Sequence, residues 1–128
     1  MAKQAATKGL RSAAEVKKRL AGITGDDKVA KWRRDTLSPY TESGSTRDRV
    51  VERMRGLMAN AWMFASGKNE SMARVNTAVL TELLWVIADG DLVKYAEDAT
   101  HFDPCGEPIL LAVSKKYGFS VPASAAKG

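Results

Sequence analysis

The stretch that decides the fold is residues 69–87, which read NESMARVNTAVLTELLWVI. Apolar residues recur there at helical spacing on more than one stripe, because Val75 and Val79 belong to one row and Leu80 and Leu84 to another. A surface helix needs only one apolar face, so this segment is predicted to be a helix that is covered on two sides. The cover can come from the same chain or from a second subunit, and the sequence leaves both open.

Helical spacing of apolar residues also predicts a long helix over residues 47–66, which Gly67 ends. With the segment above it would form a helical hairpin. Two short helices are predicted downstream, over 88–98 and over 109–117, the second with Pro108 at its first position. Because no segment shows a sustained alternating strand pattern, the predicted fold class is all-α.

Composition indicates an ordinary globular chain. The protein has 128 residues, 45% of them hydrophobic and 27% charged, which suits one compact core. Its single cysteine, Cys105, cannot form an internal disulfide. The longest apolar stretch, residues 78–88, is well short of the roughly 20 residues that a membrane-spanning helix needs. We therefore expect no membrane segment and a cytoplasmic location, in the host cytoplasm if the protein is viral.

Charge is distributed unevenly along the chain. The whole protein carries a formal charge of +5, but residues 1–34 hold ten basic and three acidic residues, a net of +7. Residues 35–128 hold ten basic and twelve acidic residues, a net of −2. Such asymmetry predicts that the first quarter of the chain contacts a nucleic acid or another anionic surface.

The basic quarter carries its own helix signals. Ser12 and Glu15 match a capping box, which predicts a helix over 13–21. A glycine-containing turn follows, and a second helix capped by Asp26 or Asp27 is expected to run to Leu37. The predicted organisation is a flexible basic arm (1–11), a basic two-helix module (12–37), a linker (38–45), a helical core and oligomerisation domain (46–118) and a tail (119–128).

Residues 12–34, SAAEVKKRLAGITGDDKVAKWRR, resemble the helix-turn-helix segments of DNA-binding proteins. The residues that carry the resemblance are Leu20 near the end of the first helix, Gly22 and Ile23 in the turn, and Val29 and Trp32 in the second helix. The resemblance implies that the second helix enters a major groove of double-stranded DNA.

Residues expected to contact DNA fall into three groups: the arm, the start of the second helix and the cations around it. In chain order they are Lys3, Lys8, Arg11, Lys17, Lys18, Thr24, Lys28, Lys31, Arg33 and Arg34. Because acidic residues share the tip of the second helix, we expect phosphate contacts to supply most of the affinity.

The order of a basic two-helix module, a linker and a helical hairpin is similar to that of the small terminase subunits of tailed bacteriophages. This resemblance implies a homo-oligomer that binds viral DNA and passes it to a large motor subunit. The oligomer interface is expected on the hairpin, at Met58, Trp62, Leu80, Leu84 and Ile87.

Enzyme signatures are not found in the sequence. His101, Asp103, Cys105 and Glu107 alternate in one loop, but no second ligand pair at zinc spacing accompanies them. We therefore expect no catalytic residue, no metal and no cofactor. The three tryptophans, Trp32, Trp62 and Trp85, fall in or beside apolar stripes and are expected to be core anchors.

An alternative function also fits the charge pattern. The basic N-terminus could dock on an acidic protein surface or on RNA instead of DNA, and the chain would then be a small adaptor, inhibitor or assembly factor.

Overall fold

The computed structural model describes residues 9–42, 46–67, 69–102 and 106–121. Its helices, in chain order, are α1 (Ala13–Gly22), α2 (Lys28–Leu37), the short 3₁₀ helix η2 (Ser38–Thr41), α3 (Arg47–Ser66), α4 (Glu70–Val86), α5 (Gly90–Phe102) and α6 (Glu107–Tyr117). No strand occurs within these ranges. The predicted all-α fold class is confirmed.

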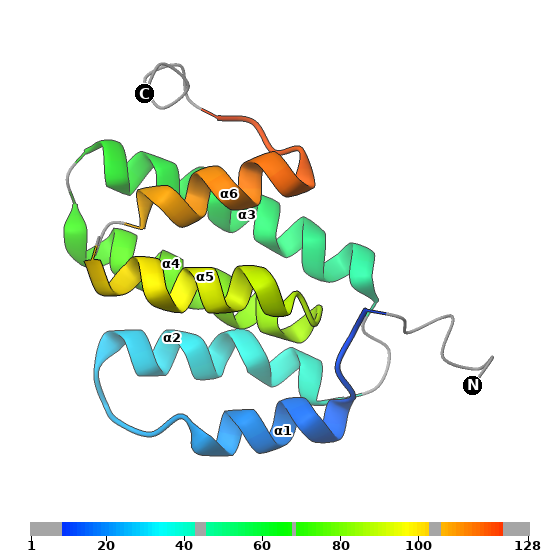
Figure 1. The fold of residues 1–128 in the computed structure, drawn as a ribbon. Helices are drawn as coiled ribbons and strands as arrows, with labels where there is room; N and C mark the ends of the chain where they lie inside the picture. Colours follow the sequence, from blue (N-terminus) through cyan, green and yellow to red (C-terminus); the bar gives the residue numbers. More distant parts are fainter. Residues whose placement is uncertain (1–8, 43–45, 68, 103–105, 122–128) are drawn as a thin grey trace.

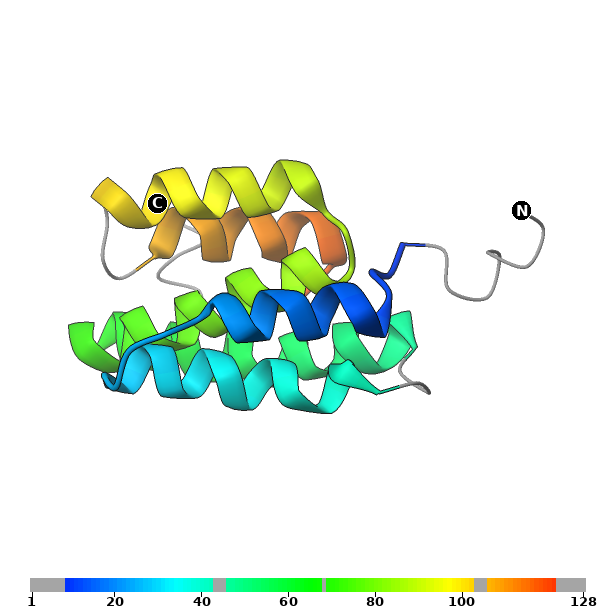
Figure 2. The ribbon, with the colours of Figure 1, turned by 90° about the horizontal axis from the view of Figure 1, so that it is seen from below.

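Helix α4 lies in the middle of the molecule (Figures 1 and 2). It packs against α2, α3 and α5, while α6 packs against α3 and α5. The α1–α2 pair runs antiparallel along one side of this arrangement. The predicted hairpin of α3 and α4 is therefore present, and α4, which also packs against α2 and α5, is the central helix of the chain.

Burial explains the central place of α4. Of its 17 residues, 11 are buried, and the valines and leucines among them join a single hydrophobic core with α1, α2, α3, α5 and α6. The prediction of a helix covered on two sides is confirmed, and the covering helices belong to the same chain.

The predicted oligomer interface is corrected by this packing. The five residues assigned to it are at most 4% exposed, inside the core of one protomer: Met58, Trp62, Leu80, Leu84 and Ile87. Side chains that the chain's own helices already cover are not available to a second copy. An interface with a second copy would use other residues.

Most helix ends follow the local signals. Ser12 and Glu15 form the predicted capping box at α1, and Asp27 caps α2 by accepting a hydrogen bond from the Ala30 N–H at 2.7 Å. Asn69 likewise caps α4. Helices α5 and α6 are longer than predicted, because α5 continues to Phe102 and α6 begins at Glu107.

The predicted linker does not separate two packing units. Its first residues, 38–41, continue α2 as the helix η2, on which α1 packs. Val16 of α1 and Leu37 of α2 are buried in the same core as α3 and α4. The basic segment contributes apolar side chains to that core, so the two-helix module is not independent. Residues 43–45 lie outside the described residues.

Both predicted chain ends are also partly packed. The backbone N–H of Arg11 donates to the carbonyl of Val86 at 2.8 Å, which attaches the end of the predicted arm to α4. Phe119, assigned to the tail, is 7% exposed and stacks with Tyr117. Residues 1–8 and 122–128 lie outside the described residues.

Gly106 lets α6 begin close to α4. Its φ of +72° is a conformation that favours glycine, and a Cβ there would lie 2.3 Å from Oγ1 of the buried Thr77. Gly118 has the same φ of +72° at the end of α6, but a Cβ there would meet no atom within 4 Å.

We predict that Gly106→Ala lowers the free energy of unfolding by about 3 kcal/mol, because a steric clash adds to the backbone strain. Gly118→Ala, which imposes the strain alone, should lower it by about 1 kcal/mol. Urea unfolding of both variants measures the difference. Equal losses of unfolding free energy would show that the Thr77 side chain moves aside and that the close approach of Gly106 to Thr77 is unimportant.

Asp89 connects the start of α5 to α6. Its carboxylate accepts hydrogen bonds from the Leu92 N–H at 3.2 Å and from the Tyr117 hydroxyl at 2.6 Å, and it pairs with Lys116 at 2.8 Å. Burial alone would raise the pKa of Asp89, but the hydrogen bonds and the charge of Lys116 outweigh it and lower the pKa.

A lowered pKa in the folded state means that Asp89 stabilises the protein above its unfolded pKa of about 4 and loses this effect as the pH falls through the folded value. Asp89→Asn should therefore cost about 1–2 kcal/mol at pH 7, with the deficit shrinking as the solution is acidified below about pH 4. Urea unfolding across this pH series measures it. The exposed neighbour Asp91 supplies the control Asp91→Asn, and a deficit independent of pH would contradict the assignment.

Candidate functional site

A buried glutamate lies where α1, α2 and α4 meet. Glu82 of α4 is 0% exposed. Its Oε1 accepts a hydrogen bond from Nε of Arg19 at 2.5 Å, and its Oε2 accepts one from Nε of Arg33 at 2.8 Å. The NH2 group of each arginine also donates to Oε2. Two guanidinium groups from two helices therefore bind one carboxylate.

Two arginines on one carboxylate leave a positive excess. A buried carboxylate loses the stabilisation of water and needs charged partners close by. Arg19 and Arg33 supply them, with side chains 24% and 32% exposed. Because two cations surround one anion, this cluster carries a net charge of +1 at the protein surface.

Trp85 extends the cluster along α4. The guanidinium carbons of Arg11 and Arg19 lie 4.5 and 4.7 Å from its ring centroid, within the range of cation–π attraction. Nε of Arg11 also donates to the Trp85 carbonyl at 2.8 Å. The indole ring thus positions Arg11 and Arg19.

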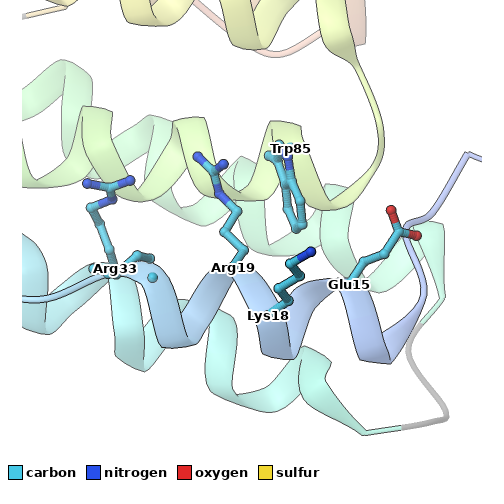
Figure 3. Close-up of a pocket in the computed structure, with 7 residues that line it drawn as sticks. Glu15, Lys18, Arg19, Arg33 and Trp85 are labelled. Atoms are coloured by element: carbon cyan, nitrogen blue, oxygen red, sulfur yellow. The ribbon is translucent and has the colours of Figure 1, made fainter.

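These residues line a surface groove of about 460 Å³, which we call the basic groove. It is bordered by Glu15, Lys18, Arg19, Gly22, Ile23, Arg33 and Trp85. Figure 3 shows Arg19 and Arg33 extending from α1 and α2 toward α4, with Lys18 and Trp85 beside them and Glu15 at one end.

Glu15 at the end of the basic groove is already engaged. It accepts hydrogen bonds from the Ser12 backbone and hydroxyl and lies 3.7 Å from Arg11. The backbone hydrogen bond from Ser12, followed by the hydroxyl bond, lowers the pKa of the Glu15 carboxyl. Its charge is therefore directed at α1 and Arg11 rather than at Lys18.

Several residues predicted to contact DNA are exposed. Lys17, Lys18, Thr24, Lys28 and Lys31 all lie at the surface. In the described part of the chain, none of the four lysines forms an ion pair or a hydrogen bond through its side chain. Lys3 and Lys8 lie outside the described residues.

Three residues predicted to contact DNA, Arg11, Arg33 and Arg34, also bind the protein through their guanidinium groups. Arg11 binds Trp85 and Arg33 binds Glu82. Arg34 donates to the carbonyls of Gly25 at 2.8 Å and Ile23 at 3.3 Å, which closes the turn between α1 and α2. These side chains are half-buried and point toward the protein.

The prediction that the three tryptophans are core anchors is confirmed only in part. Trp62 is 4% exposed in the core, as predicted, and Trp85 is half-buried. Trp32 is 38% exposed and is not a core anchor. It shares the uncovered side of α2 with Lys28, Lys31 and Asp35, which we call the outer face of α2.

The sequence reasoning missed Arg19, Glu82 and Trp85 as site residues. One signal was available: Glu82 is an acidic residue inside the apolar run 78–88. An acid in such a place needs a cationic partner. Nothing in the sequence identifies Arg19 and Arg33 as the partners, because they are 63 and 49 residues away.

No group of three or more candidate metal ligands occurs among the residues that the structure describes. Of the loop considered for metal binding, Asp103 and Cys105 lie outside the described residues. Among the described helices, none is long and apolar enough to span a membrane.

Comparisons with protein-family models, with curated proteins and with solved structures find no match for this chain.

Glu82→Gln should lower the free energy of unfolding by about 3 kcal/mol, because it removes the charge that balances two partly buried guanidinium groups. The control is Glu70→Gln in the same helix, where an exposed pair with Arg74 at 3.7 Å contributes under about 1 kcal/mol. Urea unfolding compares the two. Similar small losses in both variants would show that the Glu82 cluster does not hold α1 and α2 on α4.

Proposed function

We propose that the protein is a non-enzymatic DNA-binding protein that contacts double-stranded DNA with the solvent-facing side of the α1–α2 pair. The observation that carries the proposal is the exposure of Lys17, Lys28 and Lys31 without ionic partners among the described residues. Unpaired cations on one helical pair attract the phosphate backbone and release its counterions on binding.

The kind of cation favours backbone contact over base readout. Lysine is a flexible point charge, whereas arginine makes the bidentate contacts that read guanine. In α1 and α2, Arg19, Arg33 and Arg34 are engaged by the protein, and lysines are left at the surface. Trp32 adds a flat apolar surface beside Lys28 and Lys31, suited to contact with sugars or bases.

The finer form of the proposal follows the resemblance to small terminase subunits. Several copies would bind viral DNA in the host cytoplasm and pass it to a large motor subunit. Contact with a second copy or with that subunit would use apolar side chains outside the core. Met63, Tyr95 and Leu111 are 60%, 44% and 39% exposed and are suited to this role.

The same three apolar side chains support the second candidate function. A small adaptor or inhibitor without DNA contact would bind a protein partner through them, with the lysines facing acidic residues of that partner. Because such a protein needs no nucleic acid, DNA titration separates the two candidates.

The experiment measures duplex DNA binding by fluorescence anisotropy between about 50 and 200 mM salt, a range over which phosphate contacts weaken steeply. We expect Lys28→Gln/Lys31→Gln to reduce the slope of log K against log[salt] by about two, one unit for each lost phosphate contact. The matched control, Lys94→Gln/Lys115→Gln, removes the same charge from exposed positions of α5 and α6. Equal effects of the two double variants, or binding that ignores salt, would overturn the proposal.

A further inference from the structure

We propose that the basic groove is a binding site for a phosphate group, held by the guanidinium groups of Arg19 and Arg33 and by the ammonium group of Lys18. This site is distinct from the outer face of α2, and the inference does not require that face to bind DNA.

The first support is the set of donors that remains free. Arg19 and Arg33 each use Nε and NH2 to bind Glu82, which leaves the NH1 group of each without a partner in the described part of the chain. The Lys18 ammonium is likewise unpaired there. A phosphate offers acceptor oxygens that suit several such charged donors at once.

The second support is preorganisation. Each guanidinium group donates to the Glu82 carboxylate through two of its nitrogen atoms, Nε and NH2. The plane of each group is therefore oriented before a ligand binds. A ligand therefore does not have to order two long side chains on binding, which reduces the entropy cost. Trp85, within 4.7 Å of the Arg19 guanidinium, restrains that side chain further.

The third support is the charge balance. Lys18, Arg19 and Arg33 contribute three positive charges against the single negative charge of Glu82, and Glu15 is engaged by Ser12 and Arg11. The remaining excess of two positive charges matches a phosphate monoester dianion. Because the arginines are partly buried, solvent screens this attraction less than on an open surface.

The fourth support is space. The groove volume of about 460 Å³ exceeds what a bare phosphate needs, and Gly22 on its wall keeps one side open, since no atom lies within 4 Å of a Cβ built there. The Trp85 ring supplies an apolar wall. A phosphate attached to an organic group therefore fits the groove, and its source can be a free phosphate ester or the end of a nucleic acid.

The experiment follows the Arg19 and Arg33 Nε–H signals and the Trp85 indole N–H signal of the full chain by NMR. The probes are inorganic phosphate, a nucleoside monophosphate, and one oligonucleotide with either a 5′-phosphate or a 5′-hydroxyl. We expect saturable shifts with the phosphate probes. A preference for the nucleoside monophosphate identifies a small ester as the ligand, and a preference for the 5′-phosphorylated oligonucleotide identifies a nucleic-acid end.

Lys18→Gln should weaken phosphate binding about tenfold, as expected for the loss of one charge-assisted contact. The matched control is Lys94→Gln, which removes the same charge from an exposed position of α5, outside the groove lining and outside the α1–α2 pair. It should leave phosphate binding unchanged.

Two results would overturn the inference: equal effects of the two lysine variants, or shifts that chloride at the same ionic strength reproduces. The failure of duplex binding is a separate result. Lys28→Gln/Lys31→Gln should reduce duplex affinity and leave the phosphate shifts intact, so the two proposals can fail independently.

Discussion

The ion pairs that Arg19 of α1 and Arg33 of α2 form with Glu82 hold the N-terminal helices on α4. The carboxylate lies inside the most apolar helix of the protein, where an unpaired charge would be strongly destabilising. Arg19 and Arg33, from two helices at the basic end of the chain, provide the cationic partners of this carboxylate. The ion pairs join the basic segment to the helix at the centre of the core, and the same arrangement forms the groove beside them.

The same constraint sorts the cations of the first quarter into two groups. Arginines, whose planar groups can bind a carboxylate, a carbonyl or an aromatic ring, face the protein at Arg11, Arg19, Arg33 and Arg34. The lysines of that quarter that the structure describes, Lys17, Lys18, Lys28 and Lys31, are more strongly hydrated and lie at the surface. A charge count treats both groups alike, although only the lysines remain wholly available to an outside partner. Arg19 and Arg33 instead form part of the basic groove, which carries an excess of positive charge.

The secondary structure could largely be predicted from local signals. The capping box at Ser12, the cap at Asp27 and the end of α3 before Gly67 depend on neighbouring residues, so the sequence reveals them directly. The tertiary predictions were less accurate. The residues assigned to a subunit interface, such as Leu84, lie in the protomer core, and Trp32 lies at the surface. Apolar spacing shows that a side chain needs cover without showing which helix covers it.

By itself, the sequence determined the all-α class, most helix boundaries, the central role of residues 69–87 and the excess of positive charge in the first quarter. Only the tertiary structure decided which charges remain free, because pairing joins residues as far apart as Arg19 and Glu82. Those pairs depend on how α1 and α2 pack on α4. Helix formation depends on neighbours within a few residues. The charges available to a ligand depend instead on which side chains are paired by contacts between residues far apart in the sequence.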